Sequence, residues 1–197
     1  ASRGLGDVYK RQKLFFDPKE GLGLNIIRYN IGGGDDPTHH HITRTDSMVP
    51  GYAINPSHDA NGYHWSYDWN ADQNQRNVLM KVAECYGKDL IVEGFSNSPP
   101  YFMTNSGCSS GSVNAGENNL REDAYGAFAS YLADVAQHFS KEWGIHFQSM
   151  TAMNEPDTEY WHALSDKQEG CHFDPGESQS VMILSLIHIS EPTRRVV

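Results

Sequence analysis

Three short apolar runs alternate with two amphipathic segments along this chain, and the alternation limits the folds it can adopt. The apolar runs are rich in β-branched and aromatic residues, as buried strands are, whereas the amphipathic segments repeat their apolar residues at helical spacing. Strand, helix, strand, helix, strand is the pattern of a parallel α/β sheet. The predicted strands cover residues 25–31, 90–95 and 145–153, and the predicted helices cover about residues 72–86 and 125–143.

The loops that follow the predicted strands are much longer than the turns that precede them. This asymmetry favours a (β/α)8 barrel, in which the strand-to-helix loops carry the site, while a doubly wound sheet stays open as an alternative. The longest loop, residues 35–70, has no helical or strand period but is rich in Trp and Tyr, so we expect it to fold over a binding face. We expect Asp72 to cap the first helix and Cys85 to be buried within it.

Composition and charge exclude several classes of protein. The formal net charge of -10 argues against a nucleic-acid partner, because phosphate binding requires a basic surface. No stretch approaches the ~20 apolar residues of a membrane-spanning helix, so we expect no membrane partner. Aromatic residues make up 11% of the chain and the loops are rich in Asn, Gly and Ser, which is compatible with a polysaccharide or oligosaccharide substrate.

The two ends of the chain have complementary coding sequences. Residues 7–12 can be encoded by GATGTGTATAAGAGACAG, and the reverse complement of that DNA encodes residues 184–189. The same relation extends to residues 2–6 and 190–194. The ends resemble the translated adapter of a transposase-based sequencing library, so we expect residues 1–12 and 184–197 to be adapter-derived and residues 13–183 to belong to a longer protein.

Asn154, Glu155 and Pro156 end the third predicted strand. Pro156 cannot donate a ladder hydrogen bond, so the strand stops there and the chain turns into a loop. A carboxylate at this end of a parallel strand lies where α/β folds carry their chemistry. We therefore expect Glu155 to be a catalytic acid/base acting on sugars. From the motif alone, a structural carboxylate in an ion pair or a helix cap is an equally good interpretation.

Three motifs, in this order, resemble those of glycoside hydrolase family 30, and most of all its endo-β-1,6-galactanase branch. They are GLGLNIIRYNIGGGDDP (residues 21–37), EGFSNSPPYFMTNSG (residues 93–107) and SMTAMNEPDTEYW (residues 149–161). The resemblance covers essentially all of residues 13–180. It implies that residues 13–183 are the N-terminal part of a catalytic (β/α)8 TIM barrel, with roughly strands two to four, their helices and their long βα loops.

The resemblance also implies catalytic roles for three residues. Glu155 would be the general acid/base, Asn154 would bind the 2-hydroxyl of the sugar beside the cleaved bond, and Arg28 would support the nucleophilic carboxylate. These roles agree with the chemistry, because a glycosidic oxygen is a poor leaving group until it is protonated. A retaining enzyme needs a second carboxylate ~5 to 5.5 Å away, and the family carries it near the end of strand seven, beyond this chain.

Six further residues are expected to bind the sugar. Asn30, Asn97, Ser98 and Tyr101 would line the site with hydrogen-bonding groups. Trp69 and Trp161 are candidate aromatic platforms, because a flat ring covers the apolar face of a pyranose, although core packing is an equally good interpretation for either tryptophan.

The histidines and cysteines give weaker signals. Three consecutive histidines, residues 39–41, lack Cys or Glu at ligand spacing, so we expect no metal, and we expect no cofactor. Cys108 and Cys171 lie in loops after adjacent strands and form a candidate disulfide if the complete protein is secreted.

These observations together predict a fragment of a retaining, endo-acting β-glycosidase that hydrolyses β-1,6-linked galactan, such as arabinogalactan side chains. A related β-glucanase, xylanase-like or glucosylceramidase-like hydrolase and a catalytically inactive sugar-binding barrel remain alternatives. The fragment should be inactive alone because its nucleophile is missing, and we expect the complete protein to be secreted or at the cell surface.

Overall fold

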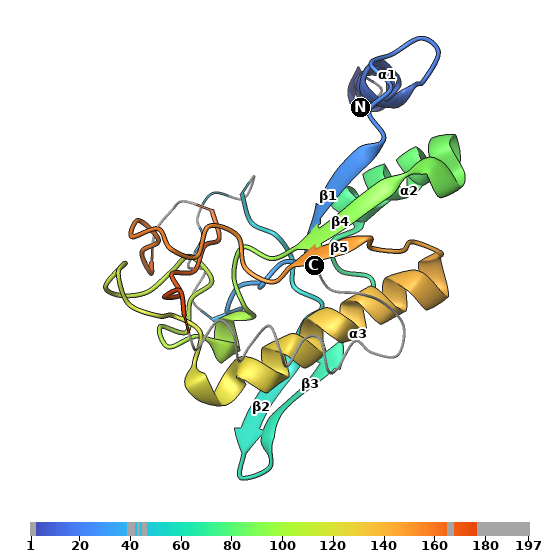
Figure 1. Cartoon of the computed structure of the whole chain (residues 1–197). Helices are drawn as coiled ribbons and strands as arrows, with labels where there is room; N and C mark the ends of the chain where they lie inside the picture. Colours follow the sequence, from blue (N-terminus) through green and yellow to red (C-terminus); the bar gives the residue numbers. More distant parts are fainter. Residues whose placement is uncertain (1–2, 39–41, 43, 45–46, 165–167, 177–197) are drawn as a thin grey trace.

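A three-stranded parallel sheet forms the centre of the computed structural model, which describes residues 3–38, 42, 44, 47–164 and 168–176. Its strands are β1 (Ile26–Asn30), β4 (Ile91–Phe95) and β5 (Ser149–Thr151), in the order β1-β4-β5 (Figure 1). Parallel pairing in this order confirms the three predicted strands, although the third is shorter than expected.

The two predicted helices connect these strands. They are α2 (Gln73–Tyr86) and α3 (Tyr125–Trp143), and each is followed by a glycine whose backbone N–H donates to a carbonyl of the last turn. Short 3₁₀ turns lie at η1 (Gly87–Asp89), η2 (Tyr101–Met103) and η3 (Glu122–Ala124). The long loops after β1, β4 and β5 gather at one end of the sheet, on the left of Figure 1.

The hydrophobic core lies between one face of the sheet and the helices. Tyr29 on β1 and Val92 on β4 are buried, and the ring of Phe139 on α3 meets the ring of Tyr29 edge-on, with centroids 4.8 Å apart. The predicted apolar face of α3 is confirmed, since Phe128 and Phe139 are fully buried with the leucine and valine between them. Burial of this face, not helix propensity, holds α3 in place.

A β-hairpin occupies part of the segment that the sequence predicted to be an irregular loop. Strands β2 (Ala53–Asp59) and β3 (Gly62–Tyr67) pair antiparallel, and Figure 1 shows the hairpin extending past α3. The expectation of no strand between residues 35 and 70 was therefore wrong. The prediction failed because it relied on alternation of aliphatic residues, whereas the hairpin is half-exposed and its alternating residues are Tyr and Trp.

Two smaller expectations were also wrong. Asp72 precedes α2 but makes no side-chain cap, because its carboxylate is buried and accepts hydrogen bonds from the Tyr29 hydroxyl (2.6 Å) and the Gln75 amide (2.6 Å). Cys85 is exposed and not buried, since the buried face of α2 is formed by Leu79 and Val82.

Helix α1 (Arg3–Phe16) lies at the opposite end of β1 from the long loops (Figure 1). The helix runs without a break across the expected adapter boundary between residues 12 and 13. Residues 1–2 and 184–197 lie outside the described residues, so the adapter assignment stays a prediction. Within the described residues, no helix is both long enough and apolar enough to cross a membrane.

Candidate active site

An ion pair crosses from β1 to β4 on the sheet face that the helices do not cover. Arg28 and Glu93 are register partners, and the Arg28 Nε donates to Glu93 Oε1 at 2.6 Å. The guanidinium also lies over the ring of Phe95, 4.1 Å from its centroid, as cations and aromatic rings prefer. Arg28 is therefore held by Glu93 and Phe95, and its terminal nitrogens can reach other groups.

Asn154 meets this arginine from the end of β5. Arg28 Nη2 donates to Asn154 Oδ1 at 3.3 Å, and the backbone N–H of Asn154 donates to the carbonyl of Ser96 at 2.8 Å. Both residues were predicted site members, and the structure brings them together across 126 residues of sequence. The contact fixes the Asn154 side chain next to Glu155 in the chain.

Glu155 occupies an unusual backbone conformation at the strand end. Its φ of 49° lies in the left-handed region, which costs a residue other than Gly roughly 1–3 kcal/mol. The side chain is exposed, and the Tyr160 hydroxyl donates to Glu155 Oε2 at 2.8 Å. Thr158 Oγ1 donates to the Glu155 carbonyl at 2.8 Å, which holds the turn.

Two members of this cluster were not predicted as site residues. Glu93 on β4 accepts from Arg28 and also from Ser149 Oγ (3.3 Å) and Thr151 Oγ1 (3.4 Å), so its carboxylate contacts both neighbouring strands. A charged residue within an apolar strand, opposite Arg28, was the available signal. Tyr160 lay within the third motif, but its contact with Glu155 depends on the turn at residues 155–158.

The predicted polar sugar-binding residues lie around the same strand ends. Asn30 is buried, and its Oδ1 has no hydrogen-bond partner among the described residues. Ser98 is buried and donates through Oγ to the Pro99 carbonyl, so its hydroxyl serves the loop itself. Asn97 and Tyr101 are half-buried in the loop after β4, where burial and the nearby Asp36 raise the pKa of the Tyr101 phenol.

The sequence matches O-glycosyl hydrolase family 30 over residues 15–192. The chain belongs to this family. It is 41% identical over 172 residues to an endo-β-1,6-galactanase of Hypocrea rufa, covering 82% of this chain and 34% of that protein. It is 30% identical over 186 residues to an exo-β-1,6-galactobiohydrolase of Bifidobacterium longum subsp. longum, covering 79% and 12% respectively. The chain thus spans about a third or less of these relatives' lengths.

Solved structures share the fold, among them that of a GH30 enzyme. The catalytic domain of GH30 xylanase C from Talaromyces cellulolyticus gives a TM-score of 0.68 at 19% identity, covering 95% of this chain and 39% of that one. A conserved exported protein from Bacteroides fragilis gives a TM-score of 0.78 at 24% identity, covering 98% and 39%. This family 30 chain is accordingly a mixed α/β structure built on a parallel sheet.

The structure does not place Trp69 with the other predicted site residues of this family 30 chain. Its indole is stacked between Tyr67 (centroids 4.4 Å apart) and His138 on α3 (3.7 Å apart), so both faces are covered. Trp161 follows Tyr160 and is 5% exposed, and a Cβ on Gly170 would lie 2.1 Å from its ring. The geometry favours the packing interpretation for both tryptophans.

Cys108 and Cys171 are separate thiols, so the candidate disulfide is not formed in the structure. Each sulfur has another partner: Cys108 Sγ shares a hydrogen bond with the Ser110 hydroxyl, and Cys171 Sγ donates to the His172 carbonyl. Burial raises the pKa of the Cys171 thiol to about 12, which leaves it inert as a thiolate nucleophile near neutral pH.

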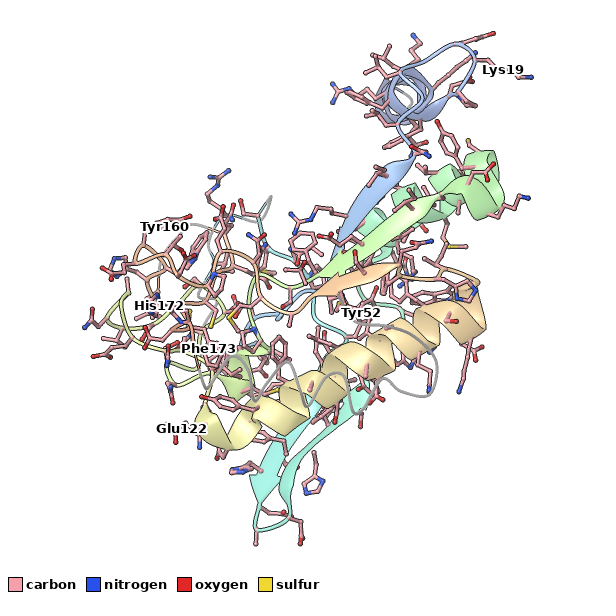
Figure 2. All side chains as sticks on the ribbon, viewed as in Figure 1. Lys19, Tyr52, Glu122, Tyr160, His172 and Phe173 are labelled. Atoms are coloured by element: carbon pink, nitrogen blue, oxygen red, sulfur yellow. The ribbon has the colours of Figure 1, made fainter. Side chains whose placement is uncertain are left out.

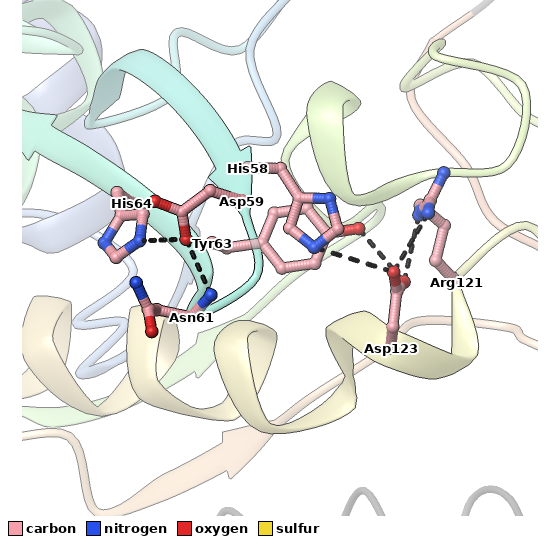
Figure 3. Close-up of polar contacts among 7 residues, drawn as sticks. All are labelled: His58, Asp59, Asn61, Tyr63, His64, Arg121 and Asp123. Carbon is pink, nitrogen blue, oxygen red and sulfur yellow. Dashed lines mark hydrogen bonds and ion pairs between the residues drawn. The ribbon is translucent and has the colours of Figure 1, made fainter.

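A second polar cluster joins the hairpin to η3, the turn directly before α3 (Figure 3). Tyr63 donates to Asp123 Oδ1 at 3.1 Å, and Arg121 binds the same carboxylate through two nitrogens. The Arg121 guanidinium lowers the pKa of Asp123 to about 2. His58 stacks on Tyr63 and lies 3.7 Å from Asp123, whereas His64 contacts Asp59. These pairs join two elements of the fold and carry no sign of a reaction centre.

In the described part of the chain, no three His, Cys, Asp or Glu residues are grouped so that they could hold a metal ion. The three consecutive histidines, residues 39–41, lie outside the described residues.

Proposed function

We propose that this chain forms the acid/base part of the active site of a retaining β-1,6-galactan hydrolase. The observation that carries the proposal is the contact between Arg28 and Asn154 beside Glu155, at the carboxyl ends of the sheet of a family 30 chain. Glu155 would protonate the glycosidic oxygen, and Asn154, held by Arg28, would bind the neighbouring sugar hydroxyl. The substrate class rests on the two β-1,6-galactan-cleaving relatives.

The reaction requires a second carboxylate as nucleophile, ~5 to 5.5 Å from the acid/base. Glu93 lies on the same sheet face, but Arg28, Ser149 and Thr151 occupy it, so we do not assign it this role. We propose that the nucleophile belongs to another part of the complete protein and that Arg28 also orients it. The chain alone should therefore not hydrolyse β-1,6-galactan.

We also propose that the described fold is part of a (β/α)8 barrel, close to its strands two to four. The sheet face opposite the helices supports this, because Ile26 (62% exposed) and Ile91 (43% exposed) lie on it without cover. Exposed apolar residues side by side on a sheet face indicate a surface that is buried in the complete protein. The complete protein is proposed to be secreted or at the cell surface, in line with its likeness to an exported protein.

Replacing Glu155 by Gln in the complete protein tests the acid/base role. We expect Glu155→Gln to lower kcat/KM on β-1,6-galactan by about 10²–10⁴-fold, because the leaving oxygen is no longer protonated. The loss on an activated aryl β-galactoside, whose leaving group needs little protonation, should be much smaller. Glu159→Gln, which removes an exposed carboxylate in the same loop, is the matched control.

Equal losses on both substrates would argue against an acid role for Glu155. Binding of galactan by the complete protein without hydrolysis of either substrate would favour a sugar-binding barrel that lacks catalysis.

A further inference from the structure

A short buried segment touches the loops that follow all three strands of the parallel sheet. Residues 169–173, here called the brace, are buried at every position. The backbone N–H of Gly170 donates to the Ser109 carbonyl (3.0 Å) in the loop after β4. The N–H of Phe173 donates to the Pro156 carbonyl (2.8 Å), one residue from Glu155. Figure 2 shows His172 and Phe173 within this group of loops, on the same side of the molecule as Tyr160.

The third attachment of the brace is the side chain of Glu169. Its Oε1 accepts a hydrogen bond from the backbone N–H of Gly33 at 3.0 Å. Gly33 belongs to the turn after β1, three residues after Asn30, which ends Arg28's strand. A Cβ at Gly33 would lie 2.5 Å from the Pro99 carbonyl oxygen, so this turn is pressed against the loop after β4.

The surroundings of Glu169 favour an uncharged carboxyl group. The residue is 1% exposed, and Oε2 is buried with no hydrogen-bond partner among the described residues. The charged groups that act on it from the neighbouring elements are Asp35 in the loop after β1 and Asp72 before α2, both acidic, with the Tyr131 phenol on α3 nearby. An ionised carboxylate with an unpaired oxygen among other acids is strongly disfavoured, whereas the neutral acid is tolerated.

We propose that Glu169 is a positioning residue that, as an uncharged carboxylic acid, fastens the turn after β1 to the brace beside Glu155. Through this contact the strand carrying Arg28 and the loop carrying Asn154 and Glu155 are held in one arrangement. Ionisation of Glu169 would place an unpaired negative charge in this buried contact and thereby release the turn after β1. That Glu169 positions Arg28 and Glu155 for catalysis rests on the proposed function. Its contact with the turn after β1 does not.

The proposal has a defined dependence on pH. Desolvation is the main cause that raises the pKa of Glu169 well above its usual range, and Asp72 and Asp35 add to it. Because the folded state then holds a proton that the unfolded state has lost, stability is greatest below the usual Glu pKa of about 4.3 and falls as pH rises towards the raised value. The fall should be roughly ten-fold in the folding equilibrium constant for each pH unit in that window.

The experiment compares three forms of the complete protein: wild type, Glu169→Gln and Glu117→Gln. Gln keeps the Oε1 acceptor and mimics the neutral acid, whereas Glu117 is an exposed carboxylate and serves as the control. Denaturant unfolding is followed from about pH 5 to about pH 9. We expect the folding equilibrium constant of wild type and Glu117→Gln to fall with rising pH. For Glu169→Gln the fall per pH unit should be smaller by about ten-fold, the contribution of one titrating proton.

Two further readouts separate positioning from bulk stability. Because Glu155 is also proposed to carry a proton, the infrared C=O band of protonated carboxylic acids at neutral pH should be weaker in Glu169→Gln than in wild type and Glu117→Gln, by the contribution of one group. Hydrolysis of β-1,6-galactan by Glu169→Gln should match wild type at neutral pH and persist to higher pH, because the turn cannot be released by ionisation.

Equal pH slopes for wild type and Glu169→Gln, a carboxylic-acid band of equal size in the two, or failure of Glu169→Gln to fold would each overturn the proposal. The unfolding and infrared measurements need no substrate. Absence of galactan hydrolysis in the wild-type protein would therefore count against the proposed function and leave the role of Glu169 to be decided by those two readouts.

Discussion

The two faces of the parallel sheet differ in how completely this chain covers them. On one face, Tyr29 and Val92 are buried under α2 and α3. On the other face, Ile26 and Ile91 are exposed near the start of the strands, and Arg28 and Glu93 form an ion pair nearer their ends. Apolar side chains at one end and charged groups at the other fit the proposed barrel, whose interior would be packed below and polar at its mouth. The covered face stabilises this chain, and the open face holds residues of the proposed active site.

The largest expected effect tests the covered face. Phe139→Ala should lower the free energy of unfolding of this chain by about 3–5 kcal/mol, because the ring is fully buried and the space cannot be refilled. The ring contacts Tyr29, Trp143 and Phe147, with centroid separations of 4.8, 4.6 and 5.0 Å. Denaturant unfolding monitored by tryptophan fluorescence measures the change.

Ile91→Ala is the matched variant on the open face. In this chain Ile91 is 43% exposed, so the loss should be about 1 kcal/mol or less. In the complete protein we expect about 2–5 kcal/mol, because barrel closure would bury the side chain fully. A cost that is the same in both would contradict the barrel and the contrast between the two faces.

A smaller effect is expected where the open face meets the loops. Tyr160→Phe in the complete protein removes the hydrogen bond to Glu155 Oε2 and should lower kcat by about three- to ten-fold with little change in KM, because a hydrogen bond contributes about 0.5–1.5 kcal/mol. Steady-state kinetics on β-1,6-galactan measures it.

Tyr63→Phe is the control for that experiment, because it also removes a tyrosine-carboxylate hydrogen bond, to Asp123 in the remote hairpin cluster. Its kcat should equal that of the wild type. If both variants lowered kcat alike, the effect of Tyr160 would be one of general stability and not of its contact with Glu155.

The elements of the covered face could be predicted from sequence because their signals are local. Apolar residues at helical spacing predicted α2 and α3, and Gly87 and Gly144 predicted where these helices end. The hairpin was missed although its two-residue loop ends at Asn61, which Gly62 follows, and Tyr63, Trp65 and Tyr67 alternate along the second strand. There the signal was present but was carried by aromatic and not aliphatic residues.

The candidate site was predictable only in part, because its contacts join distant residues. The resemblance to family 30 named Arg28, Asn154 and Glu155, and the structure brings them together. Asp72 was expected to cap α2, but its carboxylate accepts a hydrogen bond from a tyrosine 43 residues earlier. Glu169 gave no sequence signal, because its hydrogen-bond donor is the backbone N–H of Gly33, 136 residues away.

The smallest expected effect concerns the ion pair at the centre of the open face. The side chains of Arg28 and Glu93 are 48% and 29% exposed, so water screens their attraction in this chain. A double-mutant cycle with Arg28→Gln and Glu93→Gln should give a coupling of about 0.2–1 kcal/mol in the free energy of unfolding, as for other exposed pairs.

The same cycle in the complete protein separates a surface pair from an interior one. If further strands close over the open face, the pair leaves water, and removing either partner alone should cost about 3–5 kcal/mol because the other charge stays buried. Removing both should cost much less than the sum, since no unpaired charge remains. A coupling that stays below about 1 kcal/mol in the complete protein would mean that this face remains in contact with water, as it would beside an open substrate cleft.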